Sequence, residues 1–242
     1  MLIAMSVLVV PHAASAGVGK VSSPEVEKGM VEFEYSGTRY HDSARGLNNK
    51  QSHTYELEYG FTDRFLFGLE AKSAREAGEG NTLTGVGAEA QYVLTTQGDW
   101  WLTSAIKGEY LIGTHNGEPD AGELNMLASY RSGNARLIGN VGIERSFGVN
   151  QDRNVLLSSA LQASYRINPY INPGLEWHAD HGPLGDFGQQ RDTEYYAGPI
   201  ARGELIAFGN SALGYTAGYY WGLNEGAASR AARVQLGYEF AF

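Results

Sequence analysis

Acidic and basic side chains recur at every second position in several segments of the chain, a spacing that collects charge on one face of a β-sheet. The acidic candidates lie in the first two such segments, and the basic candidates lie in later ones. They are Glu32, Glu34, Glu56 and Glu58, and Lys107, Arg131, Arg136 and Arg166. Two opposed charged walls around a narrow pore create a transverse field, because low-dielectric walls concentrate field lines. We therefore expect these residues to form a constriction that orients dipolar solutes.

The same charges have two other interpretations. They could interdigitate into a salt-bridged plug that fills the interior and leaves no conducting path. The four glutamates could instead hold a hard cation such as Ca²⁺, which prefers oxygen ligands, although opposing arginines would compensate their charge equally well. We assign no metal ligand and no cofactor to this chain.

Four histidines, His53, His115, His178 and His181, lie at or near one rim of the expected fold, and Ser52 precedes His53. Lipid hydrolases of the outer membrane carry serine and histidine on the surface of a barrel. A catalytic triad is defined by geometry, however, and no Ser–His–acid set follows from this spacing. We assign no catalytic residue.

The stretch Trp177-His-Ala-Asp-His181 offers three metal-ligating side chains, His178, Asp180 and His181. On a strand, residues 178 and 180 share one face, whereas 181 follows no fixed periodicity into a loop. A structural zinc site normally has four ligands. We interpret the stretch as the polar beginning of a loop.

Strict alternation of apolar and polar residues identifies the elements that carry these charges. Val31, Phe33 and Tyr35 alternate with Glu32 and Glu34. A helix would need apolar residues three and four positions apart, so this pattern predicts strands with one apolar and one polar face.

About twelve segments of this kind have the length of a tilted membrane strand. They are 29–40, 52–61, 64–73, 82–95, 100–114, 123–131, 135–147, 155–167, 170–179, 193–208, 212–223 and 230–242. We predict an all-β fold, a closed antiparallel up-and-down transmembrane β-barrel of about 12 strands, with roughly 10–14 compatible with the pattern. Pro199 lies inside the tenth segment, where it marks a bulge or divides the segment in two.

The connections between these segments alternate in length, as they do in outer-membrane barrels with short periplasmic turns and longer outer loops. An even number of strands places both termini on the periplasmic side. Aromatic residues flank both sets of connections and predict two interfacial girdles. With apolar residues facing lipid, the charged residues of the other parity face the lumen.

The two ends of the chain suggest export and assembly. Residues 1–16 have a short apolar stretch and Ala14-Ser15-Ala16, which fits a signal-peptide cleavage site, although no basic residue precedes Lys20 and a buried first strand is the alternative. We expect 17–28 to be a periplasmic N-terminal segment, too short for a plug domain, and 29–242 to be the barrel.

Val234, Leu236, Tyr238, Phe240 and Phe242 fall on one face of the last segment, which ends on the aromatic residue. This strand resembles the C-terminal strand of bacterial outer-membrane proteins. The resemblance implies that Tyr238, Phe240 and Phe242 are the signal that the barrel-assembly machinery recognises; an ordinary hydrophobic edge strand is the alternative. It also implies outer-membrane lipid and lipopolysaccharide as surroundings.

Two further pieces, Val26-Glu-Lys-Gly29 and Tyr59-Gly-Phe-Thr-Asp-Arg64, are similar to barrels grouped with the meta-pathway phenol-degradation outer-membrane proteins. This resemblance implies a channel for small organic solutes. The pieces are strand starts and turns, so they support the fold more than any substrate.

Composition excludes one class of partner. The net charge is −9 and the chain has no long basic run, which argues against nucleic acid. We therefore expect a narrow channel for small solutes in the outer membrane of a Gram-negative bacterium. A structural barrel with a charge-plugged lumen and no transport is the first alternative, and a lipid hydrolase is the second.

Overall fold

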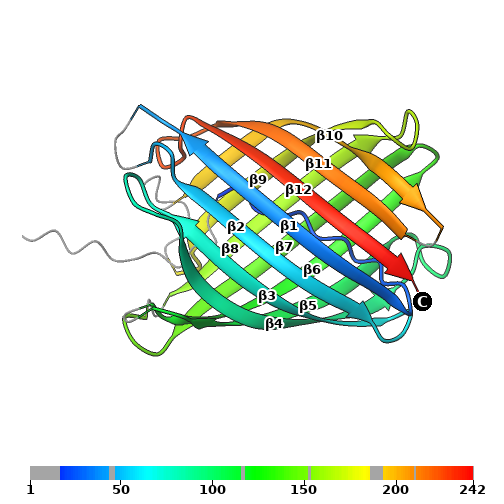
Figure 1. Cartoon of the computed structure of the whole chain (residues 1–242), viewed down its shortest axis with the longest axis horizontal. Helices are drawn as coiled ribbons and strands as arrows, with labels where there is room; N and C mark the ends of the chain where they lie inside the picture. Colours follow the sequence, from blue (N-terminus) through cyan, green and yellow to red (C-terminus); the bar gives the residue numbers. More distant parts are fainter. Residues whose placement is uncertain are drawn as a thin grey trace, which may run out of the picture.

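In the computed structural model of the chain, the described residues 17–43, 47–115, 118–151, 154–185, 193–209 and 211–241 form twelve strands (Figure 1). They are β1 (Met30–His41), β2 (Gln51–Gly60), β3 (Phe65–Arg75), β4 (Thr82–Thr95), β5 (Thr103–Gly113), β6 (Asp120–Ser132), β7 (Ala135–Phe147), β8 (Val155–Tyr165), β9 (Asn172–Pro183), β10 (Glu194–Phe208), β11 (Ser211–Gly222) and β12 (Arg230–Ala241). The expected signal peptide, 1–16, and Phe242 lie outside the described residues.

Each strand pairs antiparallel with the next, and β12 pairs with β1, so the sheet closes on itself. Tyr35 of β1, for example, lies opposite Leu236 of β12. This confirms the predicted up-and-down barrel. We call the end of the barrel that carries the β2–β3, β4–β5, β6–β7, β8–β9 and β10–β11 connections the turn end, and the opposite end the loop end. Within the described residues, no helix is long and apolar enough to cross a membrane.

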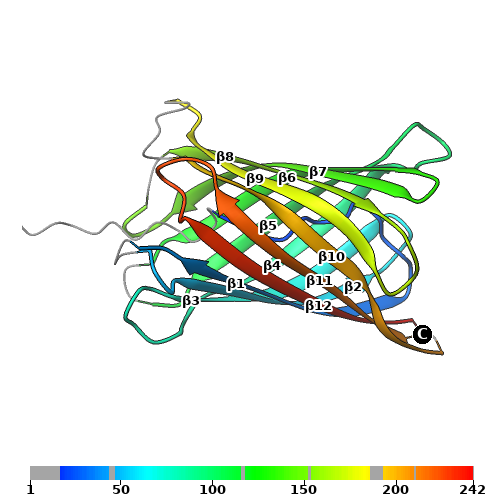
Figure 2. The same ribbon diagram turned by 90° about the horizontal axis from the view of Figure 1, so that it is seen from above.

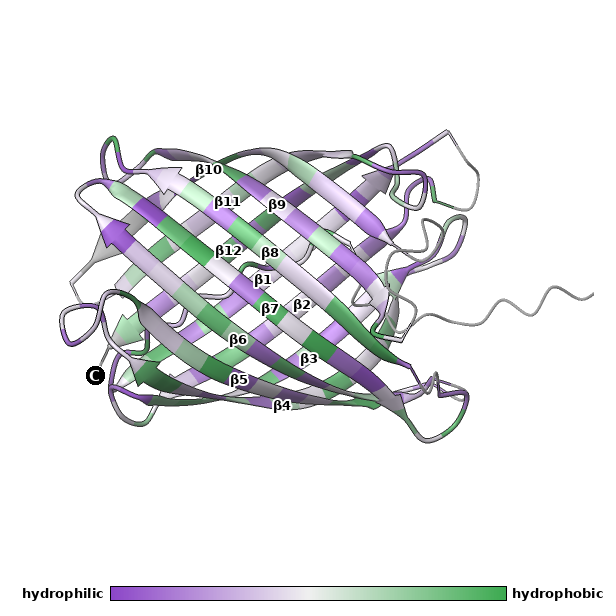
Figure 3. Ribbon diagram, turned by 180° about the vertical axis from the view of Figure 1, so that it is seen from behind, coloured by the Kyte–Doolittle hydropathy of each residue, from purple (hydrophilic) through white to green (hydrophobic). Residues whose placement is uncertain are grey.

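The alternation of the sequence becomes the two faces of the barrel wall (Figure 3). Leu57 is 50% exposed on the outer face, whereas the neighbouring Glu56 is 6% exposed in the lumen. Aromatic side chains are exposed at both ends of the outer face, including Phe61 and Tyr130 near the turn end and Trp221 near the loop end. Such rings favour the headgroup level of a bilayer.

Three local details differ from the sequence-based expectation. The tenth strand is one piece: Pro199 pairs in register with Leu175 of β9, and the irregularity in β10 lies between Glu204 and Ile206 instead. The strand predicted from residue 100 begins at Thr103, because Trp100 belongs to the β4–β5 turn. β8 ends at Tyr165, which leaves Arg166 in the following turn.

Residues 17–28, which we call the lumen segment, run through the inside of the barrel (Figures 1 and 2). At the loop end, the amide of Val18 donates to the hydroxyl of Tyr40, 3.0 Å away. At the turn end, the amide of Lys28 donates to Asp63. We expected this segment to lie outside the barrel in the periplasm, and that placement is wrong. Gly17 lies at the loop end of the barrel, whereas β12 ends at the turn end.

The two sequence pieces that resemble a known group of barrels meet where the lumen segment joins β1. The amide of Gly29 donates to the carbonyl of Gly60 at 2.8 Å, and Gly29 has a φ of 80°. A Cβ atom on Gly60 would lie 2.0 Å from the carbonyl oxygen of Glu27. Both glycines are therefore required by a close backbone approach and a left-handed turn.

Candidate functional site

The lumen wall concentrates acidic side chains on the first strands. Glu34 lies directly opposite Glu56 in the β1–β2 register, and Glu56 lies directly opposite Glu70 in the β2–β3 register. Each of the three is at most 6% exposed. Like charges at directly opposed positions destabilise a sheet, so this row needs a cation close to it.

Lys20 of the lumen segment supplies that cation. Its Nζ atom lies 3.0 Å from Glu34 Oε1 and 3.7 Å from Glu58 Oε1, and it also contacts Glu56 Oε2. Only 16% of the Lys20 side chain is exposed. Three of the predicted acidic residues therefore gather on a lysine of the same chain that lies inside the barrel.

The basic residues on the other wall face a carboxylate of the lumen segment. Glu25, near the turn end, lies 2.7 Å from Arg136 Nη2 and 3.7 Å from Arg131 Nε, and it accepts a 2.7 Å hydrogen bond from Ser129. Burial by itself raises the pKa of Glu25, but Arg136 and the hydroxyls of Ser23 and Ser129 outweigh this effect and lower the pKa below its ordinary value. Glu25 is therefore ionised at neutral pH.

The wall also forms hydrogen bonds with the backbone of the lumen segment. The amide of Ser22 donates to Asn140 Oδ1 at 2.8 Å, and Asn140 Nδ2 donates back to the carbonyl of Ser22 at 2.9 Å. Gln91 donates to the carbonyl of Ser23, and Arg233 donates to that of Gly19. Strands β4, β7 and β12 thus all bind the backbone of one extended segment.

These contacts change the expected constriction. Among the predicted residues, Glu34, Glu56 and Glu58 gather on Lys20, whereas Arg131 and Arg136 gather on Glu25. The two walls therefore do not face one another across open water, because the lumen segment places an opposite charge against each. Glu32 is half-buried on β1, directly opposite Glu58.

Arg166 does not join this group. It is exposed in the β8–β9 turn, where its backbone amide donates to the carbonyl of Asn134 at 2.8 Å. Its assignment to the lumen was wrong because the strand ends two residues earlier than the alternation indicated.

Lys107 is the centre of a second network. Its Nζ atom lies 2.6 Å from Glu89 Oε2 and 3.1 Å from Glu109 Oε1, and Lys72 lies 3.6 Å from Glu109. Lys107 is 3% exposed. The network joins β3, β4 and β5 and extends the alternation of charge along the wall.

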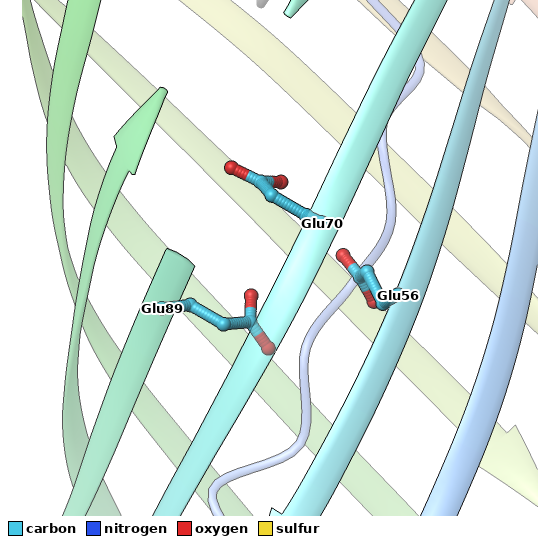
Figure 4. A group of neighbouring side chains, drawn as sticks. All are labelled: Glu56, Glu70 and Glu89. Atoms are coloured by element: carbon cyan, nitrogen blue, oxygen red, sulfur yellow. The ribbon is translucent and has the colours of Figure 1, made fainter. Parts of the chain in front are cut away.

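The carboxylates of Glu56, Glu70 and Glu89 come within 4.8 Å of one another, where the lumen segment passes beside them (Figure 4). Carboxylate oxygens are the ligands that a hard cation prefers, although Ca²⁺ takes six to eight of them. Lys20 and Lys107 each hold an ammonium group against one member of this cluster. The chain's own lysines therefore provide the positive charge that an ion would otherwise bring.

A cavity of about 230 Å³ occupies the loop half of the lumen. Side chains of both signs line it, among them Lys20, Glu56, Lys107 and Glu109, together with Tyr196. The lumen segment forms one side of the cavity through Gly17–Lys20 and Ser22.

Between β9 and β12, the lumen wall holds a buried ion pair. Arg233 Nη2 lies 2.7 Å from Glu176 Oε2, and neither side chain is exposed. Tyr220 donates a 2.5 Å hydrogen bond to Glu176, and His178 lies 3.0 Å from it. The alternation placed Glu176, His178 and Arg233 in the lumen, but their pairing across β9, β11 and β12 carried no signal in the sequence.

The histidines occupy four different settings. His53 contacts the hydroxyl of Tyr35 at 2.9 Å, and His115 contacts the carbonyl of Leu83 at 2.9 Å. His178 faces the lumen, whereas His181 contacts Ser159 on the outer face. His178 and His181 therefore cannot share a metal ion. Ser52, the serine that the sequence suggested for His53, takes no part in a Ser–His contact among the described residues.

No family model and no curated protein sequence matches the chain. Solved structures do. The KdgM porin superposes with a TM-score of 0.52 at 12% identity, over 88% of this chain and 99% of that one. The NanC porin superposes with a TM-score of 0.56 at 10% identity, over 87% of this chain and 100% of that one. The fold is that of an outer-membrane porin barrel. This confirms the predicted fold class.

Proposed function

We propose that the chain is a narrow channel for small solutes in the outer membrane of a Gram-negative bacterium. The observation that carries this proposal is the polar cavity of about 230 Å³ inside a closed barrel, lined by lysines and glutamates in close alternation. Walls of mixed charge suit solutes that are dipolar or carry both charges, because each wall attracts one end of the solute. The porin fold supports the same function, and the KdgM porin was itself solved with disordered oligogalacturonate.

Small organic solutes are the narrower form of the proposal. They rest on the resemblance of the Val26–Gly29 and Tyr59–Arg64 pieces to the meta-pathway phenol-degradation barrels. The structural support for this narrower proposal is limited to the junction that the two pieces build between the lumen segment and the wall.

The lumen segment sets the condition for transport. It crosses the interior from the loop end to the turn end and is held by polar contacts on several strands. Passage of a solute through the turn half therefore requires the segment to move. The same observation favours the alternative function, a structural barrel whose lumen stays filled.

Single-channel recording in planar bilayers separates these two functions. We expect brief, small conductance steps from the full chain and larger, long-lived steps from a variant that lacks residues 17–27. Silence from the full chain together with steady conductance from the deletion would support the structural barrel. Silence from both would overturn the channel.

We also infer how the barrel sits and assembles. Short turns belong to the periplasmic side of outer-membrane barrels, which places the turn end there and the loop end outside. Tyr238 is 44% exposed on the outer face, and its ring lies 6.0 Å from that of Phe240. These rings, with Phe242, are the proposed recognition signal for the barrel-assembly machinery, and lipopolysaccharide and lipid would surround the two aromatic girdles. Removal of Phe242 is expected to slow assembly in cells while leaving detergent refolding intact.

A further inference from the structure

The outer face carries a close contact between a serine and a histidine. Ser159 Oγ of β8 lies 2.7 Å from His181 Nε2 of β9. Ala160 and Gln162 point into the lumen, where Gln162 bonds Glu176, so Ser159 points outward by alternation. A hydroxyl within hydrogen-bond reach of an imidazole nitrogen is the arrangement that activates a serine nucleophile.

Neighbouring residues hold His181 in this position. Ala179 pairs with Ser159 on one side and with Tyr195 on the other. Its small side chain leaves space for the imidazole ring of His181 between them. The His181 ring lies 5.8 Å from that of Tyr195 and 6.1 Å from that of Trp177.

A register shift between Leu156 and Ser158 lies directly beside the pair, and Gly182 next to His181 has a φ of 72°. Such bulges re-aim side chains and are frequent beside active sites. The orientation of the His181 side chain therefore results from this irregular backbone, and a regular strand would not produce it.

An apolar groove of about 540 Å³ begins beside this pair and continues over the outer face toward the turn end. The small residues Gly139, Ala163 and Ala197 line it together with Leu161, Leu175 and Trp177. Leu161 is two residues from Ser159, and Trp177 contacts His181. An acyl chain lies in the same direction in a bilayer, with its ester near the headgroups and its tail toward the midplane.

We propose that Ser159 and His181 form a hydrolytic site for acyl esters of membrane lipids in the leaflet at the loop end, with the acyl chain in this groove. The two side chains meet on the lipid-facing side of the wall, beside Trp177 and Tyr195, and Ser159 also borders the lumen cavity. Its substrate is an amphiphile with an ester bond at headgroup depth.

The reaction needs only these groups, the ester and water. The Ser159 hydroxyl oxygen attacks the ester carbonyl carbon while its proton passes to His181 Nε2. The carbon–oxygen bond to the alcohol breaks, and His181 returns that proton to the leaving oxygen. Water then attacks the acyl–Ser159 ester, giving its proton to His181. The bond to Ser159 breaks, its oxygen regains the proton, and the fatty acid leaves.

Covalent labelling tests the nucleophile. Refolded protein in phospholipid vesicles is treated with a long-chain alkyl fluorophosphonate, and the modified peptide is identified by mass spectrometry. We expect Ser159 to carry the label, Ser159→Ala to remain unlabelled, and His181→Asn to react at least about 100-fold more slowly. Ser158→Ala, a change at the adjacent lumen-facing serine, is the matched control and should label normally.

Turnover is tested with vesicles of diacyl phosphatidylethanolamine, from which fatty acid release is measured. Ala163→Leu narrows the groove and is expected to reduce hydrolysis of a palmitoyl ester much more than that of an acetyl ester. Ala88→Leu, at an outward position of β4, is its control. Unlabelled wild-type protein, or equal fatty acid release by wild type and Ser159→Ala, would overturn the proposal. Channel conductance should be the same in His181→Asn, because His181 is not among the residues that line the lumen cavity, so the two functions can fail separately.

Discussion

Lys20 and Glu56 form an ion pair inside the barrel although 36 residues separate them in the sequence. Glu34 and Glu58 share the same ammonium group, so one lysine compensates a row of glutamates on two strands. The pair makes the lumen segment part of the wall's electrostatics. Its position therefore depends on charge as well as on the packing of Val18 and Val21, which are buried.

Replacement of Lys20 by Met should release the lumen segment. Removing one partner of a buried ion pair typically costs about 3–5 kcal/mol, and here the segment can leave while the barrel stays closed. We expect higher conductance and faster proteolysis within residues 17–28, and a lower unfolding midpoint of the barrel because the opposed glutamates lose their cation. Lys28→Met makes the same charge change at an exposed position and should leave these measurements as in wild type. Unchanged conductance in Lys20→Met would contradict this role.

Acid should loosen the turn-end part of the segment. Because the pKa of Glu25 is lowered in the folded barrel, its contribution is complete above the unfolded value of about 4.3 and is lost as the pH falls through the folded value. A spin label on Glu27→Cys can report the mobility of this part of the segment, because the chain has no cysteine and Glu27 is an exposed residue two positions from Glu25. We expect a constant spectrum from neutral pH down to the unfolded value, and greater mobility as the pH falls through the lower folded value. In a Glu25→Gln background the acid transition attributed to this residue should disappear.

Two arginines that the sequence treated alike should behave differently. Arg136→Gln removes the 2.7 Å contact with Glu25 and should increase the mobility of the label at position 27 at neutral pH. Arg166→Gln changes an exposed turn residue and should have no effect. Equal effects of the two changes would mean that Arg166 reaches the lumen after all.

Gly60 should tolerate no side chain. A Cβ there would lie 2.0 Å from the backbone oxygen of Glu27, so Gly60→Ala must displace the junction between the lumen segment and β1. We expect a loss of about 1–3 kcal/mol, measured as a lower urea midpoint of unfolding. Gly108→Ala on β5 is the control, because a Cβ at that position meets nothing within 4 Å. A similar midpoint for both variants would show that the junction can yield.

The strands could be predicted because a barrel wall has only two faces, and each residue's polarity reports which face it occupies. Glu56 and Leu57 show this directly, one buried in the lumen and one exposed on the outer face. Strand ends were less certain: Arg166 follows the alternation but lies beyond the last ladder pair of β8. Alternation cannot show where hydrogen bonding stops.

The occupied lumen could not be predicted from the same pattern. Residues 17–28 show no regular alternation of apolar and polar residues. The composition of such a short polar segment is compatible with a position outside the barrel and with a position inside it. Only the depth of Glu34, Glu56 and Arg136 on the closed wall shows that Lys20 and Glu25 match them. The contact of Ser159 with His181 was hidden for a similar reason, since a register shift set their relative position.

The bond from Arg233 to the carbonyl of Gly19 has a consequence for the order of assembly. Arg233 belongs to the last strand, which closes the seam with β1, whereas Lys20 is held by strands synthesised first. Because the lumen segment is joined to β1, it can contact β1 and β2 while the sheet is still open. β12 can then pair with β1 and enclose the segment. The barrel would in this way be built around its own contents, and the final hydrogen-bonded seam would form only when the interior is already filled.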